Sequence, residues 1–381
     1  MIIYQSAITL ILFVLFLIAV WNVYIFRTKK YPPVSNPPFV SILVPARNEE
    51  VNIKQCVSSL LNQDYPNYEV IVLNDSSEDK TGEILNGIKS EYPKLKILQG
   101  RQLEEGWTGK TFACKQLADE AIGEWLLFTD ADTTHLAGSL IGAMKIALGR
   151  DADLLSVFPE MVMKSFAEKI IMPMLFFIAF VLLPFHFVDK KGFTRFAMAV
   201  GPFMLFKRSA YDKIGGHASV KNAIVEDVWL SRKIKEHGLK LAVADGQSLC
   251  TVRMYRSFKE IWYGFSKNIF AGFNFSTPML FTINFMYAVL FFLPFVFIFQ
   301  YFFSENKNEF EFVLVFIQVI ILYLIRILLA LKFKLGSVST LLHPLGALAV
   351  PVIALNSWRW IASGTGAVWK GRIYQPKTCS K

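Results

Sequence analysis

The sequence has few charged residues and few cysteines. Charged side chains make up 18% of its 381 residues, 54% are hydrophobic, and the mean hydropathy is +0.40. These values exclude an ordinary soluble protein, because long charge-free runs alternate with a normally polar middle. We therefore predict one soluble domain carried by membrane segments.

No two cysteines have the spacing of metal ligands, which excludes a cysteine metal site of the usual kind. The four cysteines are Cys56, Cys114, Cys250 and Cys379, and they fit reduced cytosolic thiols without a role. The formal net charge of +10 fits either nucleic acid or an anionic membrane face. Because apolar runs are present, we expect the membrane and no nucleic acid partner.

An apolar run opens the chain. Residues 3–26 carry no charge, and at about 1.5 Å per residue they can cross a hydrocarbon core of about 30 Å. The length and the lack of an Ala-x-Ala-like site predict an uncleaved anchor over residues 1–27. Arg27, Lys29 and Lys30 follow, so we place the next domain in the cytoplasm and the N-terminus outside the cell membrane. Residues 28–38 form a proline-rich linker.

From residue 39, short β-branched runs alternate with polar helical stretches, at 40–44, 49–61, 69–73, 80–90 and 96–98. This βαβ pattern predicts an α/β domain with a mostly parallel sheet. Such sheets bind ligands at the carboxyl ends of their strands. Three polar features fall there: the 45–49 turn, Asp75, and the pair Asp130 and Asp132.

Asp130 and Asp132 follow the apolar run 125–128. Side chains alternate along a strand, so the two carboxylates point the same way if the backbone stays extended through Ala131, and a turn can also bring them together. Hard oxygen ligands suit Mg²⁺ or Mn²⁺ shared with substrate phosphates. The alternative is that the pair caps the segment 133–135.

Four stretches carry a family resemblance: VSILVPARNEE, VIVLNDSSEDKT, GWTGKTFACKQL and EWLLFTDADT. Over residues 39–263 the chain resembles the family 2 glycosyltransferases of the GT-A fold. The resemblance implies a nucleotide-sugar donor, with Asp130 and Asp132 at ribose, diphosphate and metal. It also implies that the base contacts Asp75 and the turn of Pro45, Ala46, Arg47, Asn48 and Glu49.

The loop 106–110 delivers one cation, Lys110. We interpret Lys110 as a partner of the diphosphate or the donor sugar. The alternative is a surface loop in which Trp107 packs on the sheet and Lys110 starts a solvated helix.

Glu226 and Asp227 open an amphipathic helix that we expect to end at Gly238. An acid in the first turn is also the usual cap, favoured by the helix dipole. The resemblance implies that Asp227 of this pair is the catalytic base. The dipole lowers the pKa of such a carboxylate, whereas burial beside a diphosphate raises it. We interpret His217 as a hydrogen-bonded loop residue.

Arg253 and Arg256 are candidates to hold the diphosphate leaving group, with membrane anchoring as the alternative. Processive members of the family carry Gln-x-x-Arg-Trp near this point. This chain has Arg253-x-x-Arg256 with the nearest tryptophan at Trp262, which argues against chain elongation.

Three further segments concern the membrane. Residues 170–188 are charge-free and interrupted by Pro173 and Pro184, so we predict an interfacial or re-entrant segment, with a true span as the alternative. A membrane region follows over 268–358, with an acidic loop at 305–311 outside and Arg326 snorkelling. Within it we expect 335–358 to be a re-entrant hairpin that returns the basic tail, 359–381, to the cytoplasm.

We therefore predict a catalytic domain over 39–267 and an inverting, metal-dependent transfer of a single sugar, glucose from UDP-glucose, to a lipophilic acceptor. The stretches RMYRSFKEIWYGFSKN and GAVWKGRIYQ resemble the bacterial carotenoid (diaponeurosporenoate) and hopanoid-associated members of the family. Two alternatives stay open: a processive polysaccharide synthase, and a non-enzymatic lipid-binding or transport protein.

Overall fold

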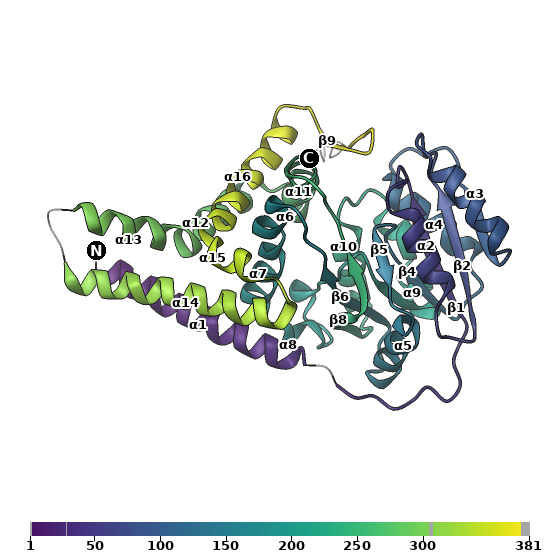
Figure 1. Cartoon of the computed structure of the whole chain (residues 1–381), viewed down its shortest axis with the longest axis horizontal. Helices are drawn as coiled ribbons and strands as arrows, with labels where there is room; N and C mark the ends of the chain where they lie inside the picture. The colour runs from purple at the N-terminus through teal and green to yellow at the C-terminus, as the bar shows by residue number, and fades with distance from the viewer. Residues whose placement is uncertain (1, 28, 305–307, 375–381) are drawn as a thin grey trace. The chain divides into compact units, whose positions relative to one another are not determined.

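The computed structural model describes residues 2–27, 29–304 and 308–374, and these fall into two compact units (Figure 1). The α/β unit comprises residues 26–162 and 186–254. The helical unit comprises residues 1–25, 163–185 and the chain from 255 onward. Within the predicted domain 39–267, residues 163–185 and 255–267 pack in the helical unit, and the domain limits stay a prediction. Glu305, and the end of the basic tail at 375–381, lie outside the described residues.

The α/β unit is built on an eight-stranded sheet of order β3-β2-β1-β4-β7-β6-β8-β5. The pairs β3–β2, β2–β1, β1–β4 and β6–β8 are parallel, whereas β4–β7, β7–β6 and β8–β5 are antiparallel. The predicted mostly parallel α/β fold is confirmed. The strands are β1 (Val40–Ala46), β2 (Tyr68–Asn74), β3 (Leu95–Gln99), β4 (Trp125–Phe128), β5 (Thr133–His135), β6 (Leu154–Met161), β7 (Met204–Lys207) and β8 (Leu241–Val252).

Helices cover the sheet because its central strands are apolar on both faces. Strand β1 is buried along almost its whole length, as expected for a parallel strand between two helical layers. Helix α2 buries Ile53, Cys56, Val57 and Leu60, the spacing of one helical face. The helices of this unit are α2 (Ile53–Leu61), α3 (Thr81–Glu91), α4 (Gly109–Glu120), α5 (Ser139–Gly149), α9 (Arg208–Lys213) and α10 (Glu226–Glu236), with 3-10 turns at Thr194–Phe196 and Gly216–Val220.

The order β2-β1-β4 brings the predicted strand-end residues to one edge. The Asp75 N–H donates to the Ala46 carbonyl at 2.8 Å, and the Thr129 N–H donates to the Leu43 carbonyl at 3.1 Å. Parallel strands end at the same edge of a sheet, so the 45–49 turn, Asp75 and the acids after β4 become neighbours.

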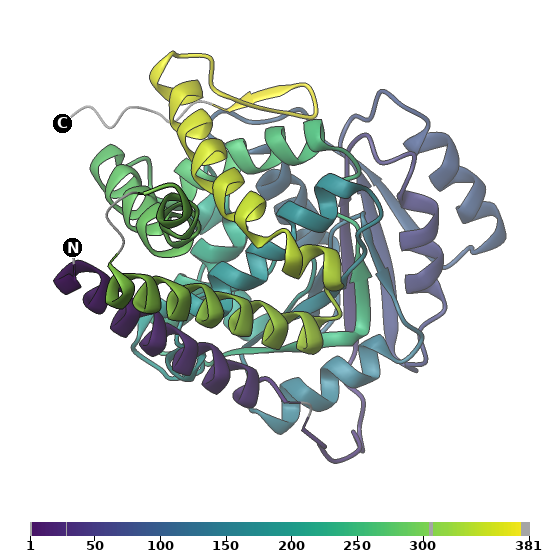
Figure 2. The same cartoon turned by 60° about the vertical axis from the view of Figure 1, so that its left-hand side comes forward.

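The helical unit contains three helices long and apolar enough to cross a membrane: α1 (Ile2–Ile25), α14 (Glu309–Phe333) and α16 (His343–Ala362). Helices α12 (Thr277–Phe291) and α13 (Leu293–Phe303) form a fourth candidate, bent by 48° at their junction. Figure 2 shows α1 running alongside α14, where the Gln318 amide donates to the Gln5 side chain at 3.0 Å. The other elements are α6 (Phe166–Ile171), α7 (Pro173–Leu182), α11 (Phe258–Gly272), α15 (Ser337–Leu341), β9 (Ala367–Trp369) and β10 (Arg372–Tyr374).

The hairpin predicted over 335–358 is wrong. Helix α16 runs from His343 to Ala362 and continues through Pro351, while Pro344 sits in its first turn, where a missing N–H costs little. The bend lies instead between α12 and α13, next to Pro294. Arg326 does not snorkel either, because its side chain is 1% exposed inside the unit.

Residues 170–188 form short helices rather than one span. Helix α7 has 10 residues, fewer than the roughly 20 that a crossing needs, and α8 (Phe185–Val188) follows it. Asn22 of α1 holds this segment, because its amide donates to the Phe180 and Leu183 carbonyls and its oxygen accepts the Phe185 N–H. The predicted place of this segment at a membrane interface stays a prediction.

Candidate active site

The backbone turns between Asp130 and Asp132. The Thr133 N–H donates to the Asp130 carbonyl at 3.1 Å, and residues 131–132 form the turn that separates β4 from β5. The chain is therefore not extended through Ala131, which excludes the first of the two geometries left open by the sequence. Asp132 Oδ1 accepts the Thr133 hydroxyl at 3.4 Å.

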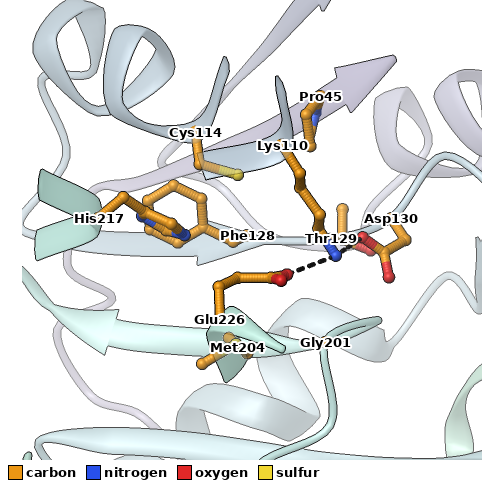
Figure 3. A pocket seen from close by; sticks show the side chains of 10 residues that line it. All are labelled: Pro45, Lys110, Cys114, Phe128, Thr129, Asp130, Gly201, Met204, His217 and Glu226. Carbon is orange, nitrogen blue, oxygen red and sulfur yellow. Dashed lines mark ion pairs between the residues drawn. The ribbon is translucent and has the colours of Figure 1, made fainter. Parts of the chain in front are cut away.

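Lys110 points into the α/β unit from the first turn of α4. Its ammonium nitrogen lies 2.6 Å from Asp130 Oδ1 and 2.8 Å from Glu226 Oε1 (Figure 3). Burial would lower the pKa of Lys110, but the charges of Asp130 and Glu226 raise it well above its usual value. The alternative of a solvated helix start is thus wrong, and the loop delivers a fixed positive charge.

The loop before Lys110 is held by hydrogen bonds. Thr108 caps α4 by accepting the Thr111 N–H, and both the Thr108 N–H and the Thr111 hydroxyl donate to the Lys221 carbonyl, at 2.8 and 2.6 Å. Trp107 packs on Phe112, with ring centroids 5.3 Å apart. These contacts position Lys110 before any ligand binds.

Asp227 is the second residue of α10, and it lies beside the same pocket. Its Oδ2 accepts the Gly201 N–H at 3.1 Å, and its Oδ1 accepts the Val228 N–H at 2.8 Å. Burial and then the neighbouring Glu226 raise the pKa of Asp227 to about 7, against the opposing effects of Lys110 and the Val228 N–H. Burial therefore outweighs the helix end, and this carboxylate can accept a proton near neutral pH.

The charged groups of the site lie around Gly201. A Cβ added there would lie 3.4 Å from Asp130 Oδ2, 3.4 Å from Lys110 Nζ and 3.5 Å from Asp227 Oδ2. The neighbouring Pro202 carbonyl accepts the Thr129 hydroxyl at 2.8 Å, which ties this segment to the end of β4. Sequence reasoning missed Gly201, although the Gly-Pro pair just before β7 was the available signal.

The space between these groups is small. A cavity of about 10 Å³, close to the volume one water needs, is lined by Pro45, Lys110, Cys114, Phe128, Thr129, Asp130, Gly201, Met204, His217 and Glu226. Figure 3 shows the Lys110 side chain crossing it between Asp130 and Glu226. A larger ligand therefore requires this side chain to change partners.

The pKa values of two buried cysteines reflect the charges of the remaining acids. Burial raises the pKa of Cys114, and the charges of Glu226, Asp130 and Asp75 add to that rise, against Lys110. Asp75 is thus electrostatically coupled to the same pocket. Burial also raises the pKa of the Cys56 thiol, and the negative charges of Asp132, Glu49 and Asp130 raise it further. Asp132, Glu49 and Asp130 therefore all lie near Cys56.

The 45–49 turn is locked to the loop after β2. The Arg47 guanidinium donates to the Asp75 and Ser76 carbonyls, both at 2.8 Å, and it pairs with Glu78 at 3.1 Å. The Asn48 N–H donates to Ser77 Oγ, and the Glu49 N–H donates to Thr81 Oγ1. Pro45 alone of this turn lines the cavity, while Arg47 organises the loop.

The two arginines fall in different units. Val252 at the end of β8 pairs with Thr133 at the start of β5, so Arg253 and Asp132 are the next residues beyond this pair. Arg256 belongs to the helical unit, where its N–H donates to Glu260 at 2.8 Å. Arg253 is therefore brought to the strand-end acids, and the α/β unit does not include Arg256.

The acids suit a divalent cation in chemistry, although they do not form a closed cage. Around Gly201, the oxygens of Asp130, Glu226 and Asp227 outnumber the single ammonium of Lys110, and hard oxygen ligands are what Mg²⁺ and Mn²⁺ bind. No group of three or more His, Cys, Asp or Glu side chains within residues 2–27, 29–304 and 308–374 stands ready to hold an ion. Substrate oxygens would have to complete the coordination shell.

His217 lines the cavity, which sequence reasoning did not predict. Its backbone N–H donates to the Tyr211 hydroxyl at 3.1 Å, and that hydroxyl shares a second hydrogen bond with His217 Nδ1 at 2.8 Å. Burial and then the charge of Lys110 lower the pKa of His217 to about 3. The ring is therefore neutral near pH 7.

Comparisons with known proteins agree with this fold. Residues 41–215 match the model of glycosyl transferase family 2. The 4,4'-diaponeurosporenoate glycosyltransferases of Staphylococcus aureus strains USA300 and MRSA252 are each 28% identical, over 65% and 64% of this chain. The match spans the same shares of those proteins' own lengths.

A mannosyltransferase from Pyrobaculum calidifontis, solved in complex with GDP-Man and Mn²⁺, has a similar fold. Its TM-score is 0.54 at 17% identity, over 94% of this chain and 98% of that one. At this identity the likeness concerns the fold alone. Together with the family match over residues 41–215 and the curated relatives, it supports a family 2 glycosyltransferase of the GT-A fold.

Proposed function

We propose that the protein transfers a single sugar from a UDP-sugar, glucose in the first instance, to a membrane-embedded lipid acid of the carotenoid type, with inversion at the anomeric carbon. The observation that carries the proposal is the convergence of Asp130, Glu226, Asp227 and Lys110 around Gly201. The acceptor class rests on the names of the 28% identical relatives and on the apolar helices of the helical unit.

In this proposal the donor lies along the carboxyl edge of the sheet. Asp75 accepts N–H donors of the base, helped by the 45–49 turn that Arg47 holds in place. Lys110 leaves one of its two acids and contacts the diphosphate, because a diphosphate oxygen offers the same kind of charge-assisted bond. Arg253, which with Asp132 lies just beyond the β5–β8 pairing, adds a second cation on the diphosphate side.

Asp130 and Asp132 would hold Mg²⁺ or Mn²⁺. The bound ion would neutralise charge that develops on the departing diphosphate. Glu226 keeps Lys110 oriented and raises the pKa of Asp227 through its negative charge.

Asp227 acts on the acceptor. The acceptor oxygen attacks the anomeric carbon from the face opposite the diphosphate, the new C–O bond forms as the old one breaks, and the diphosphate leaves with the electron pair. If the acceptor is a hydroxyl, Asp227 takes its proton, and the pKa of about 7 suits that role. If the acceptor is a carboxylic acid, it is already ionised, and Asp227 orients it.

The test uses the full chain reconstituted in lipid, with UDP-glucose, Mn²⁺ and diaponeurosporenoic acid. Mass spectrometry should find acceptor carrying one hexose. A ladder of longer products would replace the proposal with a processive synthase. Release of no UDP with any acceptor or divalent ion would favour a lipid-binding protein. We further propose that the site faces the cytoplasm, with the N-terminus outside, which protease accessibility in sealed vesicles would test.

A further inference from the structure

Polar side chains gather inside the helical unit, whereas the residues proposed for sugar transfer belong to the α/β unit. Arg326 of α14, His343 at the start of α16 and Ser339 of α15 are each 1% exposed, and Tyr287 of α12 is 6% exposed. The charge of Arg326 acts on both Tyr287 and His343. The Phe177 ring lies 6.0 Å from the Arg326 guanidinium and 5.0 Å from the His343 ring. Several helices thus contribute to one buried cluster.

Arg326 is bonded only to neutral groups. Its Nη2 donates to the Ser339 carbonyl at 2.7 Å and to the Ser339 hydroxyl at 3.2 Å, and its Nη1 donates to the Pro173 carbonyl at 3.3 Å. Among the described residues, no carboxylate forms an ion pair with this guanidinium. A buried cation without a counter-ion is costly, and in an apolar helix it commonly marks a functional site.

The cluster also keeps unused hydrogen-bonding groups. Arg326 Nε, the Tyr287 hydroxyl and both ring nitrogens of His343 are buried and have no hydrogen-bond partner. The guanidinium and the hydroxyl are donors, and a neutral imidazole adds one more. An oxyanion would satisfy these groups and balance the charge, because carboxylate and phosphate oxygens each accept several donors.

The surroundings of the cluster are aromatic. Phe291 packs against Tyr287 and Phe177, both with centroids 5.0 Å apart, and Phe295 lies 5.8 Å from His343. Apolar walls around a positive centre suit a ligand with an acidic head and a hydrophobic chain. We propose that Arg326, His343 and Tyr287 bind the oxyanion of an acidic lipid within the helical unit. This site is separate from the transfer chemistry and does not depend on which sugar is moved.

The experiment measures binding of cis-parinaric acid, a fluorescent polyene fatty acid, to the purified full chain in an uncharged detergent, with its methyl ester as the control ligand. We expect the acid to bind at least about tenfold more tightly than the ester. Arg326→Met should abolish that preference. Lys332→Met removes a cation from the last turn of the same helix and should leave it unchanged. Equal binding of acid and ester, or a preference that survives Arg326→Met, would overturn the proposal.

Two variants keep the test decisive if Arg326→Met does not fold. Tyr287→Phe and His343→Phe preserve the ring contacts and remove only polar atoms, so each should weaken acid binding and leave ester binding unchanged. No change in either variant would contradict the assignment. Competition then names the occupant: displacement by palmitate alone indicates a carboxylate, displacement by phosphatidylglycerol indicates a phosphate, and displacement by neither rejects the oxyanion site.

Discussion

The two units hold a cation in opposite ways. In the α/β unit, Lys110 lies between two carboxylates at 2.6 and 2.8 Å, so the chain itself supplies the counter-charge. In the helical unit, Arg326 contacts carbonyls and one hydroxyl, and its charge stays unbalanced by the described residues. In the first arrangement the charged groups are already paired, and they shift one another's pKa values. In the second arrangement a bound ligand would have to supply the negative charge that balances Arg326.

The largest expected effect follows from removing the acid that accepts the proton. If the acids around Lys110 form one catalytic set, Asp227→Asn should lower kcat for a hydroxyl acceptor by about 10²- to 10⁴-fold, the usual contribution of a general base. Glu236→Gln changes an exposed acid of the same helix and is the matched control. Steady-state transfer from radiolabelled UDP-glucose measures kcat of both variants. An unimpaired Asp227→Asn enzyme would show that Asp227 does not belong to the catalytic set.

Substitution of Asp132 should affect metal binding rather than proton transfer. We expect Asp132→Ala to weaken Mn²⁺ binding in the presence of UDP by about tenfold or more, because a hard oxygen ligand is lost. Electron paramagnetic resonance of free Mn²⁺ reads this directly, and Asp64→Ala, an exposed acid elsewhere, controls for charge. Unchanged Mn²⁺ affinity would remove Asp132 from the metal site.

Lys110→Met sharpens the comparison with Arg326. It leaves Asp130, Glu226 and Asp227 without their cation, so UDP-glucose binding should weaken by about tenfold, as for the loss of one charged partner of a phosphate. Lys115→Met removes an exposed lysine of the same helix and should have no effect. Calorimetric titration with UDP distinguishes them, and equal affinities in both variants would show that Lys110 balances acids without contacting the donor.

The smallest effect is a pH dependence. The pKa of Asp227 is raised to about 7, so its basic form appears only as the pH rises through that value. With a hydroxyl acceptor, kcat/KM should therefore increase about tenfold per pH unit below 7 and level off above it. A carboxylic acid acceptor needs no base, and its profile should be flat there. A hydroxyl profile that falls across this range would contradict the role of Asp227.

The sequence was sufficient for the parts of the site that parallel strands determine. Strand ends meet at one edge, so Asp75 and Asp130 were predictable from the βαβ pattern, and their roles came from the family resemblance. Gly201 and His217 were not, because β7 reaches its place beside β4 by antiparallel pairing across a long sequence separation. The Gly201-Pro202 pair indicates a turn before β7, but no local pattern shows which strand β7 pairs with.

The helical unit shows a different limit of prediction from sequence. Charge-free runs predicted the apolar helices, but a proline alone does not mark a bend, since α16 passes through Pro351 whereas the α12–α13 junction bends next to Pro294. Arg326 was expected to snorkel because long side chains reach the interface. Its burial depends on carbonyls of Pro173 and Ser339, which only the tertiary structure brings within reach.

A cryo-electron microscopy map of the full chain with UDP-glucose and Mn²⁺ tests the central claim most directly. We predict the uracil beside Asp75, the ion at Asp130 and Asp132, Lys110 on the diphosphate, and the anomeric carbon facing Asp227. Nucleotide density at another edge of the sheet, or an anomeric carbon directed away from Asp227, would contradict it.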